Sequence, residues 1–244
     1  MTVIRDRMQA VNFIREAQKS LNPVIMLNDV ARIIGKSKEY SRVYVHRLKS
    51  RNLIREVERG KYALTDDPFE IASGIVFPSY ISFISAYSIY GLTTQMPSTI
   101  HVVALRSRKP ISAEGVKIEF IRLRKQNFFG YKREKFRDKY IFIAEPEKAI
   151  IDALYLPRYC PISESYEALK GKEISPEKLI EYALRIGSCV VIKRLGYLLE
   201  LHNIDIYESV KHRLNHRYDL LNPYMKKSKR TSKKWRISIN EVFE

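Results

Sequence analysis

The sequence is poor in the residues on which disulfide scaffolds, zinc sites and nucleotide-binding loops depend. Its 244 residues include only two cysteines, Cys160 and Cys189, too few for a disulfide framework or a four-cysteine zinc site. Its nine glycines are scattered along the chain and form no phosphate-binding loop. Residues 1–10 contain charged side chains and lack the apolar core of a secretory signal. We therefore expect a cytoplasmic protein that holds no metal and no cofactor.

Long apolar runs and acidic residues are also scarce. No stretch is long and apolar enough to span a bilayer or to lie in one, so we expect no membrane partner. The chain has 44 lysines and arginines against 27 acidic residues, a formal net charge of +17. The excess is densest at the two ends, with +6 in residues 1–67 (14 basic, 8 acidic) and +6 in residues 207–244 (10 basic, 4 acidic). Such a charge attracts polyanions and makes nucleic acid the first partner to consider.

Residues 23–65 contain, in order, the parts of a winged helix-turn-helix. Asn28 can cap a first helix, and Gly35 can end it. Ser37 can cap a second helix that runs to about Ser50. The inward face of this second helix would consist of Ser41, Tyr44, Val45 and Leu48, which follow helical spacing. Strands over residues 53–57 and 61–64 would then form a short β-ribbon.

The opposite face of the second helix is basic and polar, as a recognition helix requires. Lysine and arginine contact phosphates, and side chains near the helix N-terminus contact base edges. Gly60 can form the tight turn of the ribbon and leave its neighbours on the wing tip. The candidate DNA-binding residues are Lys36, Lys38, Tyr40, Arg42, His46, Arg47, Arg59 and Lys61. The alternative is a winged helix used for protein docking, with a charged face that is only solvated.

The rest of the chain predicts an α+β fold in three consecutive parts. The expected helices cover residues 78–90, 145–155, 176–186, 188–201 and 206–214, and the expected strands cover residues 99–105, 116–123 and 140–144. The domains would be a winged helix-turn-helix at 1–67, a small α+β domain with an antiparallel sheet at 68–158, and a helical C-terminal part with a basic tail at 159–244.

Two further regions are basic. The first is interleaved with aromatic residues, a combination that suits nucleic-acid or protein contact, and it contains Arg122, Arg124, Lys125, Lys132, Arg133 and Lys135. A solvated hairpin arm anchored by its phenylalanines is an equal alternative. The second is the tail, where seven of the eleven residues 226–236 are Lys or Arg. It could be a disordered anion-binding arm, although Trp235 and Ile237 suggest that its end packs on the fold.

A magnesium-dependent nuclease is the enzymatic alternative, because it needs clustered carboxylates and usually a lysine. The candidates are Glu114, Glu119, Glu145, Glu147 and Asp152, with Lys117 and Lys148 nearby. Glu145 and Glu147 are better explained as first-turn acids of a helix. His212 and His216 are four residues apart but lack a third ligand. The sequence therefore predicts a protein that is not an enzyme and has no catalytic residues.

After the predicted winged helix, three segments follow that together resemble a known family: Tyr80–Leu92, Ala144–Tyr155 and Arg194–Glu200. In this order the chain resembles the AbiEi-type antitoxin family of abortive-infection toxin–antitoxin systems. Members of that family are transcriptional regulators paired with a nucleotidyltransferase-like toxin. The similarity covers most of the chain.

The resemblance implies an antitoxin that also represses its own operon. The winged domain would bind double-stranded operator DNA through the eight residues named above. The part from residue 68 to 244 would counteract the cognate toxin, either directly or without a stable complex, with residues 122–139 as a candidate surface. The strongly basic tail departs from the family and could extend the DNA footprint. We expect a monomer or a weak dimer, and a stand-alone DNA-binding protein remains an alternative.

Overall fold

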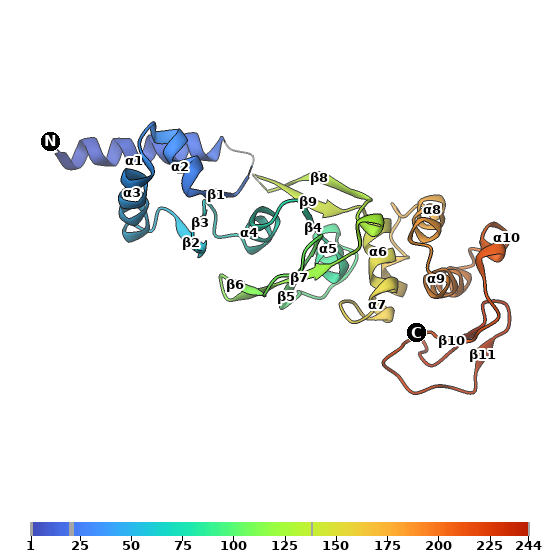
Figure 1. Cartoon of the computed structure of the whole chain (residues 1–244). Coiled ribbons are helices and arrows are strands. Elements are labelled where there is room, and N and C mark those ends of the chain that lie inside the picture. The colour runs from blue at the N-terminus through green and yellow to red at the C-terminus, as the bar shows by residue number, and fades with distance from the viewer. Residues whose placement is uncertain (1, 20–21, 138, 244) are drawn as a thin grey trace. The chain divides into compact units, whose positions relative to one another are not determined.

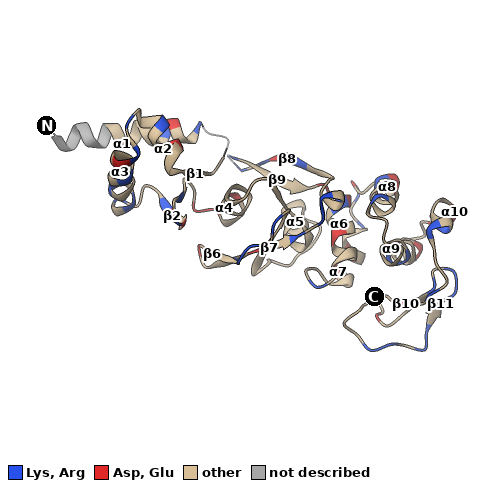
Figure 2. Ribbon diagram, viewed as in Figure 1, with Lys and Arg blue, Asp and Glu red and all other residues tan. Residues whose placement is uncertain are grey.

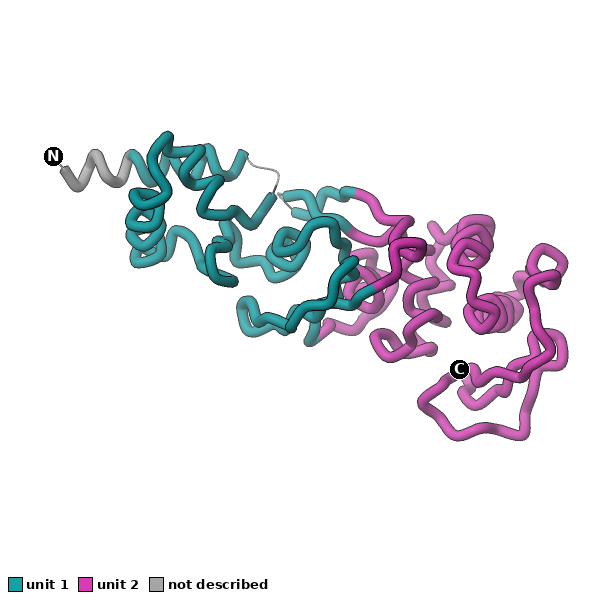
Figure 3. The backbone as a smooth tube through the Cα atoms, viewed as in Figure 1, with its two compact units in different colours: residues 1–81, 98–122, 133–142 teal, residues 82–97, 123–132, 143–244 magenta. Residues whose placement is uncertain are grey.

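The computed structural model describes residues 2–19, 22–137 and 139–243, and its fold is mixed α+β as expected (Figure 1). Contacts between residues divide the chain into two compact units (Figure 3). The first consists of residues 1–81, 98–122 and 133–142, and the second of residues 82–97, 123–132 and 143–244. This division cuts across the expected consecutive segments 1–67, 68–158 and 159–244. Strand pairing is the reason, because it gathers residues distant in the sequence.

The N-terminal part of the first unit has three helices and a small sheet. Its elements are α1 Thr2–Gln18, β1 Val24–Met26, α2 Leu27–Ile34, α3 Lys38–Ser50, β2 Arg55–Glu58 and β3 Lys61–Ala63. The strands are antiparallel in the order β1-β3-β2. Apolar side chains of all three helices meet in one buried cluster that includes Phe13, Val30, Tyr44, Leu48 and Tyr62. Helix stripes thus supply this core, as their periodicity predicts.

Most local signals at these helix ends are confirmed. The Ser37 hydroxyl accepts the Tyr40 N–H at 3.3 Å and caps α3. Gly35 ends α2 in the left-handed conformation with φ 64°. The predicted cap Asn28 is wrong, because α2 begins at Leu27 and the Asp29 carboxylate accepts the Met26 N–H at 2.9 Å. A carboxylate in the first turn is a stronger acceptor than an amide and also benefits from the helix dipole.

A helix and a six-stranded mixed sheet follow. The helix is α4 Pro68–Ile75, and the strands are β4 Ser79–Ile81, β5 Thr99–Ala104, β6 Ile111–Ala113, β7 Val116–Arg122, β8 Tyr131–Phe136 and β9 Lys139–Ala144. The strand order is β6-β7-β5-β4-β9-β8. The expected antiparallel sheet is wrong in one place, because β5 and β7 run parallel. Between them the chain forms an additional strand, β6, which pairs antiparallel with β7 and reverses the chain once more.

The helix expected over residues 78–90 is also shorter in the structure. Residues Ser79–Ile81 form β4, with Tyr80 opposite Val103 of β5, and helix α5 covers only Phe83–Tyr90. Helical spacing of the aromatic residues continues back to Tyr80, so the sequence alone does not show the boundary. The ladder of backbone hydrogen bonds to β5 decides the conformation of these residues.

The second unit is built around one central helix. Its elements are α5, the 3₁₀ turn η1 Lys125–Asn127, α6 Pro146–Tyr155, α7 Ile162–Ala168, α8 Pro176–Ile186, α9 Cys189–Leu201, α10 Tyr207–Val210, the 3₁₀ turn η2 Lys211–Arg213, β10 Asp219–Leu220, β11 Thr231–Ser232 and β12 Ile237–Ser238. Helices α5, α7, α8 and α9 all contact α6. Residues 147–154 of α6 are consequently buried on every side.

The sequence predicted a helical C-terminal part, but the structure also has strands there. Helix α10 and a 3₁₀ turn replace the helix expected over residues 206–214, and three short strands follow in the order β10-β12-β11. Trp235 is fully buried, which confirms that the tail packs on the fold. Its indole N–H donates to Glu200, and its ring lies against Gly196 of α9.

Two buried cations of α9 hold the residues that lead into this sheet. The Lys193 ammonium donates to the Asn215 side chain at 2.8 Å and to the Asp219 carboxylate at 2.6 Å. The Arg194 guanidinium donates to three backbone carbonyls, those of Leu154 at 2.8 Å, Leu220 at 3.2 Å and Leu221 at 2.9 Å. These bonds connect α9, the end of α6 and β10.

The close approach of Trp235 to Gly196 gives a test of this packing. A Cβ atom at position 196 would overlap the indole ring. Alanine is a better helix former than glycine by about 1 kcal/mol, yet we expect Gly196→Ala to lower the free energy of unfolding by about 1–3 kcal/mol through overpacking. Emission of this sole tryptophan should shift to the red as the ring becomes hydrated.

Leu201→Ala is the matched control, because Leu201 lies at the end of the same helix and its side chain is 42 % exposed. It should leave the emission spectrum unchanged. An unshifted spectrum and unchanged urea unfolding for Gly196→Ala would show that Trp235 does not pack on α9.

Candidate nucleic-acid interface

The buried face of α3 determines which side chains the helix exposes. Ser41, Tyr44, Val45 and Leu48 are buried, as the sequence predicted. The Tyr44 ring packs edge-on against Phe13 of α1 with ring centroids 5.5 Å apart, and its hydroxyl donates to the Gln9 carbonyl at 3.3 Å. These contacts fix the rotation of α3 about its axis, so the opposite face points to solvent.

The exposed face of α3 carries cations without an ion-pair partner. Lys38, Arg42, His46 and Arg47 are exposed, and Lys36 is exposed in the turn before the helix. Lysine and arginine positions of α3 are blue in Figure 2. Within the described ranges, no carboxylate lies within 4 Å of the charged groups of Lys36, Lys38, Arg42 or Arg47. Five of the eight predicted residues are therefore exposed on α3 and in the turn before it.

Two apolar groups interrupt this basic face. Tyr40, which the sequence analysis included, is 43 % exposed and stacks on Tyr44 with centroids 6.4 Å apart. Val43, which it did not include, is 53 % exposed, and helical spacing places it on the side of α3 opposite the buried stripe. Its exposure could have been predicted from the sequence, because Val43 lies outside the buried 41-44-45-48 stripe. Exposed methyl groups on a basic helix suit contact with the C5-methyl group of thymine.

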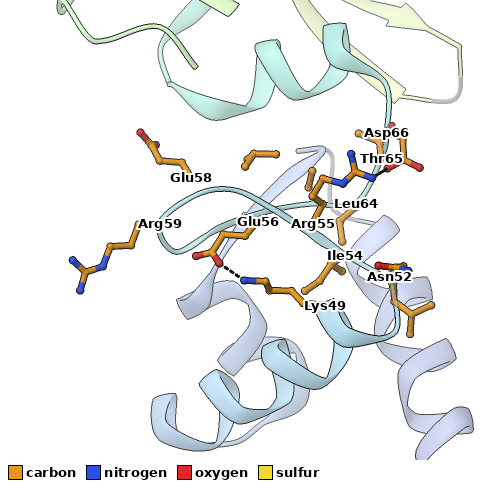
Figure 4. A pocket seen from close by; sticks show the side chains of 13 residues that line it. Lys49, Asn52, Ile54, Arg55, Glu56, Glu58, Arg59, Leu64, Thr65 and Asp66 are labelled. Carbon is orange, nitrogen blue, oxygen red and sulfur yellow. Dashed lines mark hydrogen bonds and ion pairs between the residues drawn. The ribbon is translucent and has the colours of Figure 1, made fainter. Parts of the chain in front are cut away.

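The ribbon of β2 and β3 exposes one of its two predicted cations. Gly60 forms the turn with φ 76°, as expected. Arg59 is exposed and extends away from the other labelled side chains (Figure 4). Lys61 is not available at the tip, because its ammonium donates to the Ile75 carbonyl at 2.9 Å and pairs with Glu58 at 2.9 Å. The prediction for Lys61 is therefore corrected to a structural role.

A polar hollow of about 760 Å³ lies beside this ribbon and is lined by residues from Lys49 to Asp66 (Figure 4). Most of its charged groups are paired. Lys49 bonds Glu56, and Arg55 bonds Glu114 and lies 3.8 Å from Asp66. Glu58 pairs with Lys61 and Arg108. The Lys49 ammonium and the Gly60 N–H hold the pKa of the Glu56 carboxyl below its usual value. The Lys49–Glu56 pair thus holds the ribbon against α3, and Arg59 is a cation of this lining that remains exposed.

The second predicted basic region does not form one surface within a single unit. All six cations are exposed, but Arg124, Lys125 and Lys132 belong to the second unit and the others to the first. The aromatic residues between them are used in packing. Phe129 lies against Tyr182 with centroids 5.4 Å apart, and Phe136 against Phe69 with centroids 5.8 Å apart. These rings are the anchors of an arm, which favours the hairpin alternative.

The carboxylates considered for a nuclease are engaged in separate structural contacts. Glu147 accepts the Ser175 N–H at 3.0 Å, and Glu145 accepts the Tyr182 hydroxyl at 2.6 Å. Asp152 is paired with the fully buried Lys148 and accepts the Ser82 hydroxyl at 2.9 Å. Burial lowers the pKa of the Lys148 ammonium, and Asp152 partly offsets that effect. Across the described ranges, no three His, Cys, Asp or Glu side chains are grouped to hold a metal ion.

Comparison with known proteins adds no relative: no family model matches the chain, and no curated protein matches it. Of the helices in the described residues, none combines the length and apolarity needed to cross a membrane.

The different environments of Arg59 and Lys61 predict different costs of substitution. Lys61→Met removes a charged donor from the Ile75 carbonyl and a partner from Glu58, and should lower the free energy of unfolding by about 1–2 kcal/mol. Arg59→Met should change it by less than about 0.5 kcal/mol, because the side chain is solvated. Urea unfolding measures both. Equal effects would contradict the assignment of Lys61 to the structure.

Proposed function

We propose that residues 1–67 form a winged helix-turn-helix and that the protein is a DNA-binding transcriptional regulator. The observation that carries the proposal is the face of α3, where cations without ion-pair partners are exposed opposite a buried stripe. The order α1-β1-α2-α3-β2-β3 supports it, since a winged helix uses helices and strands in this order. Helix α3 would enter the major groove, and Arg59 on the ribbon would contact the adjacent backbone.

The exposed side chains would have two roles, contact with phosphates and contact with base edges. Lys36, Arg47 and Arg59 would contact phosphates and orient the domain without reading sequence. Lys38, Arg42 and Val43 lie where base edges would be read, with Arg42 able to bond guanine in a bidentate manner. If about six phosphates are neutralised, the logarithm of the binding constant should fall with the logarithm of salt concentration at a slope of about −5.

The operon-level part of the proposal rests on the resemblance to AbiEi-type antitoxins. In this role the protein represses its own toxin–antitoxin operon in the cytoplasm, and residues 68–244 counteract a nucleotidyltransferase-like toxin without catalysis. The engagement of Glu145, Glu147 and Asp152 in packing favours a role without catalysis. The two activities would then belong to different parts of the chain.

Charge reversal on α3 tests the DNA-binding proposal. Arg42→Glu should weaken binding to a duplex from the protein's own promoter by about tenfold or more, since a base contact contributes about 1–3 kcal/mol. Arg106→Glu makes the same charge change at an exposed position in the first unit and is the matched control. Fluorescence anisotropy measures affinity, and circular dichroism verifies the fold. Equal losses for the two variants would reduce the interaction to general electrostatics and contradict a recognition helix.

The separation of the two activities gives a second test in cells that express a candidate nucleotidyltransferase-like toxin. Arg42→Glu should lose repression of a promoter reporter while still protecting cells from toxin expressed from an independent promoter. Parallel loss of repression and protection would show that neutralisation works through DNA binding. Protection absent even for the unmodified protein would refute the antitoxin role and leave DNA binding intact.

A further inference from the structure

The connection between β10 and β11 presents an unneutralised basic surface, which we call the C-terminal loop and define as residues 221–230. Its Lys226, Lys227, Lys229 and Arg230 are exposed, and Lys233 is exposed directly after β11. In the part of the chain that the structure describes, none of these five cations has a carboxylate within 4 Å. The nearest acids in sequence are Asp219, which is paired with Lys193, and Glu241, which accepts the side-chain amide of Asn222 at 2.9 Å.

Hydrogen bonds from β12 and the residues after it hold the C-terminal loop in place. Asn240 donates through its amide to the carbonyls of Asn222 at 2.7 Å and Met225 at 3.1 Å. The Ser238 hydroxyl donates to the Ser228 carbonyl at 3.0 Å, and the Ile239 N–H donates to the Arg230 carbonyl at 2.8 Å. The cations are therefore displayed from an ordered backbone, which reduces the entropy lost when a partner binds.

Large exposed side chains lie in this loop or close to it in the sequence. Tyr224 is 67 % exposed, Tyr218 is 48 % exposed and Met225 is 47 % exposed. Tyr224 lies within the loop, where its N–H donates to the Asn222 side chain at 2.9 Å. Neither tyrosine packs against another ring within the described ranges. A large aromatic side chain left in water beside free lysines is the combination that stacks bases and neutralises phosphates.

The exposed ring faces distinguish between kinds of nucleic acid. In a duplex the base faces are already covered by neighbouring base pairs, so a surface tyrosine reaches only the sugar-phosphate backbone. In a single strand the bases can unstack and lie on the ring. We propose that the C-terminal loop, with Tyr218 and Tyr224, is a binding surface for single-stranded nucleic acid, separate from the duplex-binding face of α3.

The test uses the full chain in an Arg42→Glu background, so that binding by α3 is suppressed. The probes are a fluorescent oligouridylate of about 12 nucleotides, the matching oligodeoxynucleotide and a random-sequence DNA duplex. Tyr224→Ala should weaken binding of the single strands by about tenfold, since stacking of one base contributes about 1–3 kcal/mol. Duplex binding should be unchanged, and Tyr224→Phe should retain single-strand affinity. The two single-stranded probes show whether RNA or DNA is preferred.

Charge variants supply the second arm. Lys226→Glu should weaken binding of every probe, whereas Lys172→Glu, an exposed cation elsewhere in the second unit, should change it little. Trp235 emission verifies that the tail remains packed in each variant. Equal sensitivity of duplex and single strand to Tyr224→Ala, or no sensitivity of either, would overturn the proposal. So would binding to phosphatidylserine vesicles that competes with the oligonucleotides and depends on Tyr224.

Discussion

Lys193 and Arg194 are adjacent cations of α9 that lie inside the protein, where a charge without partners would cost several kcal/mol. Lysine can satisfy its ammonium with a carboxylate and an amide, and Asp219 and Asn215 supply these groups. Arginine can satisfy a planar guanidinium with carbonyls, and residues 154, 220 and 221 supply three. Burial lowers the pKa of Arg194 only to about 10, so the group stays charged at neutral pH. The ion pair and hydrogen bonds of these two cations therefore hold the chain after α9 against the helices.

The later elements of the second unit depend on this anchorage. With residues 219–221 held on α9, β10 is in position to pair with β12. Pairing of β12 in turn places Trp235 against Gly196 and provides the side chains that hold the C-terminal loop. The exposed cations of that loop are thus arranged by buried cations of a helix. A basic tail that composition alone would assign to disorder becomes an ordered surface.

The same distinction between paired and unpaired cations applies to the first unit. Lys49 and Lys61 are bound to Glu56 and Glu58, and they brace the β2–β3 ribbon. Lys36, Lys38, Arg42, Arg47 and Arg59 remain exposed, so they can exchange water and counterions for phosphate. A net charge of +17 consequently overstates the charge available to a polyanion. Pairing decides which cations can act.

Much of the candidate site followed from the sequence because α3 is specified locally. Ser37 begins it, the 41-44-45-48 stripe orients it, and the remaining positions are then exposed. Lys61 was wrongly expected at the wing tip, since its partners come from Glu58 and from Ile75, fourteen residues away. Val43 was omitted because an exposed valine has no chemical motif. The spacing of apolar residues predicts which face of a helix is buried. It does not predict which groups will pair with a charged side chain.

The sequence by itself determined the elements whose signals lie within a few residues. Helix α8 has the bounds Pro176–Ile186 that were expected, α6 begins with its proline, and Gly35 and Gly60 take the predicted turns. Only the tertiary structure decided that Ser79–Ile81 is a strand, that β5 and β7 are parallel, and that the basic tail ends in a sheet under Trp235. Helix caps and turns are satisfied by neighbours in the chain, whereas strand pairing and the neutralisation of buried charge require partners that only folding brings together.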